Sequence, residues 1–303
     1  MYDLINFVQI ESTDHLLLPG LLFEPKRKSK KAVILLHGNG SSSVFYSMPE
    51  QQQYGSAFTN FGYAYLALNN RGSGLATKLK KAGSKKSVYA GTYYELIKDC
   101  VKDIDGAIKY LKKLGYQEIY LLGFSTGANK ICVYNYYKPR NPVSAYMLIC
   151  GGDDTGLFYE ELGKKKFELL LKKARREIRK GNGSKRVPGS LLEAPYSYRA
   201  IYDTINPDGN YNTFPYNEYF NNLKLSKKKL FREFSSINKP SLVVYGASDE
   251  YAYGKVPEIV ELLKRKTKDP KKFAFEIITG ADHQFTGKQE QFLAIIISWL
   301  RKN

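Results

Sequence analysis

The chain has 303 residues, of which 43% are hydrophobic, and carries a formal net charge of +18 from 47 basic and 29 acidic side chains. This length is enough to bury one large core, or a core with an inserted subdomain. The longest apolar run, FLAIIISWL at residues 292–300, is too short to cross a bilayer. The composition is that of an ordinary globular protein without a transmembrane segment.

The first residues and the cysteines indicate a compartment. The stretch MYDLINFVQIES has no basic leader and no sustained apolar block, so the sequence predicts no secretory signal. Cys100, Cys132 and Cys150 are widely spaced and form no CxxC pair, which fits buried thiols in a reducing environment. We expect a cytoplasmic protein.

Apolar runs rich in strand-forming residues alternate with helical periods along most of the chain. The first two runs are expected to form an antiparallel edge hairpin, and the later ones are mostly apolar throughout. Interior strands of this kind, separated by amphipathic helices, predict an α/β fold with a mostly parallel sheet covered on both faces. The predicted strands are 6–10, 15–24, 32–38, 63–69, 118–124, 144–150, 241–247 and 273–279.

The clearest helical period covers residues 92–114, where apolar residues recur every three or four positions. Thr92 and Glu95 have the spacing of a capping box, which predicts that the helix begins there. Gly115 is expected to end it.

The alternation stops between Gly152 and Ile237, an interval too long for a bare loop. We therefore predict a mainly helical cap at 153–235, inserted between two parts of the core at 1–152 and 236–303. A helix at 160–180 is expected to pack its apolar stripe onto the core. This stripe consists of Phe167, Leu170, Leu171, Ala174 and Ile178.

Basic residues are concentrated at 164–186, which holds eleven Lys or Arg and only Glu168 and Glu177 as acids, a local charge of +9. One interpretation is a solvated helix face, because the helical period alone turns these side chains outward. The other is electrostatic steering of an anionic substrate or surface. No nucleic-acid-binding motif accompanies the charge, so nucleic acid is not the expected partner.

A lone serine lies in LLGFSTGANK, residues 121–130, directly after an apolar run. Gly123 and Gly127 flank Ser125, and this spacing fits either a plain turn between a strand and a helix or a nucleophile elbow. In an elbow, Cβ atoms at the flanking positions would clash, and the serine hydroxyl is exposed in a cleft. The remaining candidate residues decide between the two.

An activated serine needs a base and an acid that orients the base. Of the three histidines, His15 is expected at the surface and His37, in LLHGNG, is expected to shape a turn. His283, in TGADHQF, is the predicted base because its loop follows a strand and opens on the same sheet edge as Ser125.

The stretch VVYGASDEY offers Asp249 and Glu250 as the acid. Asp249 is the predicted acid, although an Asx turn after a strand would also explain it. The chain order Ser125, Asp249, His283 is the one expected when a serine elbow is part of a triad. Together these positions favour catalysis over a plain turn.

The segments HGNG, NNRGSG, GFSTG, SDEY and ADH resemble the α/β-hydrolase family over nearly the whole chain. More narrowly, AGTYYELIKDCVKDIDGAI, GFSTGANK, LKKARREIRKGNG, APYSYRAIYD and YGASDEYAYG resemble a little-characterised esterase-like branch that includes fungal siderophore-ester hydrolases. The resemblance implies a carboxylic ester hydrolase that needs no metal or organic cofactor. It also implies Ser125 as nucleophile, His283 as base, Asp249 as acid, and the backbone amides of Asn39 and Thr126 as oxyanion donors.

Three residues depart from the family pattern: Phe124 stands where histidine is common, and Tyr251 with Ala252 replaces a frequent Val-Pro. They leave the shape of the pocket open, and Phe124 is a candidate substrate contact. Tyr198 and Tyr202 in the cap are further candidates for the pocket wall.

Other functions share this residue set. Acyltransferases, thioesterases and peptidases use the same machinery with a different acceptor or leaving group. A non-catalytic protein with a ligand pocket and a basic surface is the alternative from another class. A small-molecule ester remains the expected partner, and the sequence gives no oligomeric state.

Overall fold

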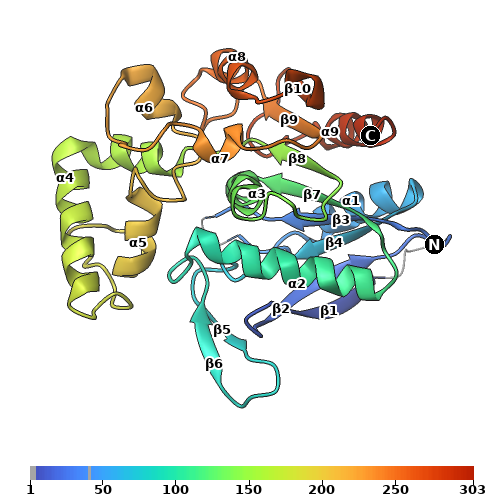
Figure 1. Ribbon diagram of the computed structural model, residues 1–303, viewed down its shortest axis with the longest axis horizontal. Helices are drawn as coiled ribbons and strands as arrows, with labels where there is room; N and C mark the ends of the chain where they lie inside the picture. The colour runs from blue at the N-terminus through green and yellow to red at the C-terminus, as the bar shows by residue number, and fades with distance from the viewer. Residues whose placement is uncertain (1–4, 40–41) are drawn as a thin grey trace.

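The computed structural model describes residues 5–39 and 42–303, and its centre is a twisted eight-stranded sheet (Figure 1). The strand order is β1-β2-β4-β3-β7-β8-β9-β10; β2 is antiparallel to both its neighbours, and all other pairs are parallel. The expected α/β architecture is confirmed, with each predicted run at one strand. The strands are β1 (Ile5–Glu11), β2 (Leu17–Phe23), β3 (Lys31–Leu36), β4 (Tyr63–Leu68), β7 (Glu118–Phe124), β8 (Ala145–Ile149), β9 (Ser241–Gly246) and β10 (Phe273–Ile278).

Helices cover both faces of this sheet. On one face α1 contacts α9, and on the other α2 contacts α3 (Figure 1). The interior strands β4, β8 and β9 are buried at every position, as expected for a sheet covered on both sides. The covering helices are α1 (Met48–Asn60), α2 (Cys100–Lys113), α3 (Thr126–Tyr137), α8 (Val256–Lys266) and α9 (Gln289–Leu300).

The helix predicted at 92–114 begins later than the capping box suggested. A short 3-10 turn, η1 (Ile97–Asp99), leads into α2. Thr92 instead donates hydrogen bonds from Oγ1 to the carbonyl oxygens of Gly72 and Gly74, and Glu95 forms an ion pair with Lys130 at 2.7 Å. The two side chains are committed to tertiary contacts, so they cannot cap a helix.

The predicted insertion contains its own apolar cluster. Residues of α4 and α5 pack against each other in this cluster. The main core, around the sheet, consists of a different set of side chains. The stripe of α4 is therefore buried mainly within the insertion, which corrects the expectation that it packs onto the core. Gly163, at φ +69°, interrupts α4. The helices are α4 (Asp154–Arg179), α5 (Tyr198–Ile205), α6 (Tyr216–Asn221) and α7 (Arg232–Ser235).

The later part of the insertion packs into the main core, unlike α4 and α5. Tyr211, Phe214, Tyr216, Phe231 and Phe234 belong to the main core. The proposed limits 153–235 thus enclose one self-packed part and one part integrated into the core, and the division of the chain into domains remains a prediction.

A two-stranded hairpin, β5 (Thr77–Lys80) and β6 (Ser87–Ala90), extends from the core and was not expected from the sequence (Figure 1). A second 3-10 turn, η2 (Pro270–Lys272), precedes β10. Among the helices that the structure describes, none is both long and apolar enough to cross a membrane.

Candidate active site

Ser125 lies at the tight turn between β7 and α3, with φ +55° and ψ −125°. This left-handed φ is rare for a residue with a side chain and persists only where the surroundings hold it. A Cβ at Gly123 would lie 2.3 Å from the carbonyl oxygen of Gly127, and a Cβ at Gly127 would lie 2.0 Å from that of Leu36. Both flanking positions therefore require glycine, which is the geometry of a nucleophile elbow rather than a plain turn.

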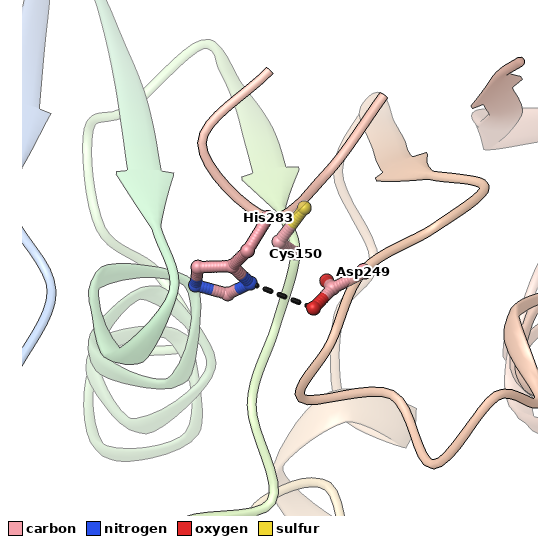
Figure 2. Close-up of side chains that lie close together, drawn as sticks. All are labelled: Cys150, Asp249 and His283. Carbon is pink, nitrogen blue, oxygen red and sulfur yellow. Dashed lines mark hydrogen bonds and ion pairs between the residues drawn. The ribbon is translucent and has the colours of Figure 1, made fainter. Parts of the chain in front are cut away.

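His283 and Asp249 come from the loops after β10 and β9 and form a buried pair (Figure 2). The Nδ1 atom of His283 lies 2.9 Å from Oδ1 of Asp249, and the two residues are only 3% and 4% exposed. Figure 2 shows that the other ring nitrogen, Nε2, points away from Asp249. Such a carboxylate fixes the ring orientation and favours the tautomer with a proton on Nδ1.

The neighbouring acid Glu250 has a different contact. Its carboxylate accepts a hydrogen bond from the backbone N–H of His283 at 3.0 Å, and does not meet the ring nitrogen that Asp249 contacts. Asp249 also accepts from the backbone N–H of Tyr251. The geometry thus favours Asp249 over Glu250 as the orienting acid.

Two aromatic rings pack against the imidazole of His283. The Phe124 and Tyr251 rings both meet His283 edge to face, with centroids 5.7 Å and 4.8 Å from it. Phe124 also packs against Phe285 and Phe292. Phe124 and Tyr251, two of the three residues that depart from the family pattern, therefore surround His283, and both line the pocket.

Ser125 and His283 line one pocket of about 450 Å³, together with Phe124, Thr126 and Asn39. The chain thus brings four of the sequence-predicted functional residues and one candidate contact to a single cavity. Asp249 lies behind His283 and is not part of the lining.

Tyr198 and Tyr202 are not among the residues that line this pocket. Ser197 caps α5 by accepting from the N–H of Ala200, and the helix then packs Tyr198 and Tyr202 against the apolar cluster of the insertion. Tyr196, just before the helix, reaches the pocket instead. The pocket therefore has an aromatic side chain at Tyr196, whereas the predicted Tyr198 and Tyr202 pack within the insertion.

The loop after β3 lies directly against the serine. A Cβ at Gly38 would be 3.1 Å from Cβ of Ser125, and Asn39 follows it. His37 is 6% exposed and its Nδ1 atom lies 2.7 Å from the carbonyl oxygen of Gly38. Burial lowers the pKa of His37 to about 3, so its ring is neutral and shapes this loop. Gly40 and Ser41 lie outside the described residues.

Asp154, at the start of α4, was missed by sequence reasoning. Thr126 donates from Oγ1 to its carboxylate at 3.2 and 3.3 Å, and the carboxylate lines the pocket. Burial raises the pKa of Asp154 to about 6, although Thr126 and Lys130 favour the charged form. No pattern around DDTG marks this residue, because it reaches the site only through the position of α4.

Three potential metal ligands lie together at the pair. The ligand atoms of Cys150, Asp249 and His283 are within 4.8 Å of one another (Figure 2). Burial raises the pKa of the Cys150 thiol, and Asp249 raises it further, so the thiol stays protonated. A metal ion would have to displace that proton and the His283–Asp249 hydrogen bond, which makes the trio a better orienting unit than a metal centre.

The sheet order and the serine turn define the class: the chain has the α/β-hydrolase fold. An esterase from Pyrococcus furiosus superposes with a TM-score of 0.58 at 19% identity, covering 99% of this chain and 91% of that one. Est1E of Butyrivibrio proteoclasticus, solved with ferulic acid bound, gives 0.64 at 14% identity, covering 97% and 98%. The α/β hydrolase GrgF from a Penicillium species gives 0.64 at 16% identity, covering 99% and 98%.

The chain belongs to the family described as protein of unknown function DUF1749, whose model matches residues 81–301. No curated protein matches the chain in sequence. The likeness to these structures shows the fold of the chain, whereas its reaction depends on the residues of the site.

Proposed function

We propose that the protein is a serine hydrolase that cleaves carboxylic esters through an acyl-serine intermediate. The observation that carries this proposal is the strained left-handed turn that places Ser125 in the same pocket as His283, whose Nδ1 is held by Asp249. A strained serine in a cavity with an oriented base is typical of nucleophilic catalysis. The structural likeness to esterases supports the same chemistry.

In the proposed first step, His283 Nε2 removes the hydroxyl proton of Ser125, and Oγ attacks the ester carbonyl carbon. Asp249 stabilises the imidazolium that forms. The C–O bond to the alcohol then breaks, and His283 returns the proton to the leaving oxygen. Water, deprotonated by the same ring, attacks the acyl-serine, and the acid is released with Ser125 restored.

The developing oxyanion needs N–H donors, for which we propose the backbone amides of Thr126 and Asn39. Thr126 is the first residue of α3, where helix N–H groups have no partner within the helix and the helix dipole favours negative charge. Asn39 follows Gly38, which contacts Ser125 closely. Two preorganised amides on either side of the serine would stabilise the tetrahedral intermediate.

A burst experiment tests the proposal. Mixing the protein with p-nitrophenyl esters of increasing chain length should release about one equivalent of p-nitrophenol rapidly where deacylation is slow, and mass spectrometry should find the acyl group on Ser125. Ser125→Ala should abolish both, whereas Ser298→Ala, at an exposed serine of α9, should retain both. Turnover that persists in Ser125→Ala would refute the mechanism.

The fate of the acyl-serine shows whether water or another molecule accepts the acyl group. If an added alcohol or amine competes with water for the acyl-serine, the products separate hydrolysis from acyl transfer. The finer resemblance to fungal siderophore-ester hydrolases makes ferric-siderophore esters a substrate class to include in the panel.

A further inference from the structure

The pocket that holds Ser125 differs in charge from the rest of the molecule. Two carboxylic acids, Glu50 and Asp154, line it, and no lysine or arginine does so within the described part of the chain. The whole protein carries a net charge of +18. A strongly basic protein thus surrounds its proposed reaction site with acidic and uncharged side chains.

The Asp154 carboxylate is short of positive partners. Within the described residues, its hydrogen-bond donor is the neutral hydroxyl of Thr126. The nearby ammonium group of Lys130 instead lies 2.7 Å from Glu95 and donates to Asn70. Burial raises the pKa of Asp154 to about 6, which leaves the group mainly ionised near pH 7.5 but poorly compensated. A cation brought by a ligand would supply the missing partner.

Glu50 lies in the first turn of α1 and faces the same cavity. Burial raises its pKa as well. In addition, the Oδ1 atom of Asn39 is buried in the lining without a donor among the described residues. The pocket therefore offers a ligand two carboxylates and an unpaired amide oxygen, and no lysine or arginine of the described residues lines it to neutralise them.

Aromatic rings complete the lining. Their faces attract cations, most strongly when the cation loses water on entering the site. Rings and carboxylates around one cavity are the side chains that recognise ammonium groups in proteins. The rings that line the pocket are Tyr46, Tyr54, Phe124, Phe158, Tyr196 and Tyr251.

We infer that this pocket selects esters that carry an ammonium group over neutral esters of the same shape, with Asp154 and Glu50 as the specificity-determining residues. The inference rests on the proposed ester hydrolysis and names its substrate class. Asp154 receives a hydrogen bond from Thr126, a proposed oxyanion donor. An ionised Asp154 repels a nearby oxyanion and so destabilises it. A cation on the substrate offsets this repulsion while the oxyanion forms.

The basic segment 164–186 does not alter this selection at the site, because none of its residues lines the pocket among those the structure describes. Its field repels cations only at long range and is screened over about 8 Å at physiological salt. The alternative from the sequence, steering of anionic esters by this segment, predicts that the cationic member of each pair below is the poorer substrate.

Two isosteric pairs of substrates test the inference. A pair of thioesters carries the charge on the leaving group, and a pair of esters carries it on the acyl group. Butyrylthiocholine is compared with S-(3,3-dimethylbutyl) thiobutyrate, and p-nitrophenyl 4-(trimethylammonio)butanoate with p-nitrophenyl 5,5-dimethylhexanoate. In at least one pair, kcat/KM at pH 7.5 and physiological salt should be about tenfold higher for the cation, the effect of one charge-assisted contact. Asp154→Asn with Glu50→Gln should reduce the ratio to within about twofold, whereas Glu258→Gln, exposed on α8, should preserve it.

A pH series gives a readout that needs no substitution. Protonation of Asp154 below pH 6 should lower the ratio of kcat/KM for the cation to that for the neutral substrate. Effects of pH on the shared catalytic step cancel in this ratio, because they act on both substrates. Equal kcat/KM within both pairs, a higher kcat/KM for the neutral member, or a ratio unchanged in the double variant would overturn the inference. Neutral esters hydrolysed through Ser125 would still uphold the proposed function in those cases. Absence of any Ser125-dependent hydrolysis would overturn both.

Discussion

The Nδ1 atom of His283 lies 2.9 Å from Oδ1 of Asp249, while the adjacent Glu250 is bound to the backbone N–H of the same histidine. Asp249→Asn should therefore lower kcat for a p-nitrophenyl ester by about 10³- to 10⁴-fold, because the amide favours the wrong tautomer. Glu250→Gln should cost less than about tenfold, since an amide oxygen still accepts the backbone hydrogen bond. Steady-state kinetics with circular dichroism as the folding control would check this. A silent Asp249→Asn beside an inactive Glu250→Gln would move the acid by one residue.

The elbow gives a prediction about stability. A methyl group at position 127 would lie 2.0 Å from the carbonyl oxygen of Leu36, so Gly127→Ala must displace β3 or the turn. We expect a loss of about 3 kcal/mol or more in the free energy of unfolding, measured by denaturant titration. Gly189→Ala is the matched control, because its new methyl group meets no atom within 4 Å. A Gly127→Ala protein as stable as this control would contradict the packing described for the turn.

The wall of the pocket supplies the third prediction. Tyr196 and Tyr202 both pack in the cluster of the insertion, but only Tyr196 also lines the cavity. Tyr196→Ala should change the relative kcat/KM of short and long esters by about tenfold, because it removes one aromatic surface from the substrate path. Tyr202→Ala should leave that ratio within about twofold. The ester panel measures both, and the reverse result would place the substrate path on the other side of α5.

Two acids in the insertion, the buried Asp153 and the half-buried Asp203, predict how the free energy of unfolding depends on pH. Burial raises the pKa of Asp203 to about 7 and that of Asp153 to about 7, above the ordinary value of 3.8. The folded state then holds protons that the unfolded state releases, so stability should fall as pH rises from about 4 to 7. Asp203→Asn should reduce this loss in the free energy of unfolding by about 1–3 kcal/mol. Denaturant unfolding at pH 4.5, 6 and 8 measures it, with Asp208→Asn as an exposed control. An unchanged slope would show that Asp203 does not carry this proton.

The sequence predicted the parts of the molecule that rest on local patterns. The eight strands follow from their apolar runs, and Gly123 with Gly127 marks the turn that the structure gives Ser125. Asp249 and His283 could be selected because loops after parallel strands open on one sheet edge. These features depend on periodicity and topology, which one chain can show.

Features that depend on packing between distant segments could not be predicted from the sequence. Glu95 pairs with Lys130 instead of capping a helix, and Asp154 approaches Thr126 only because α4 begins beside α3. Tyr196 rather than Tyr198 reaches the pocket, since that choice depends on where α5 begins. None of these contacts has a local sequence pattern.

The most direct test of the central claim is labelling with a fluorophosphonate, which reacts only with an activated serine. Intact-protein and peptide mass spectrometry should show a single adduct on Ser125 that forms in wild type, is lost in Ser125→Ala and is slowed by about 10⁴-fold or more in His283→Ala. The folded Ser298→Ala protein should label as wild type does. A wild-type protein that takes up no probe, or an adduct on any other residue, would contradict the claim that Ser125 is the nucleophile.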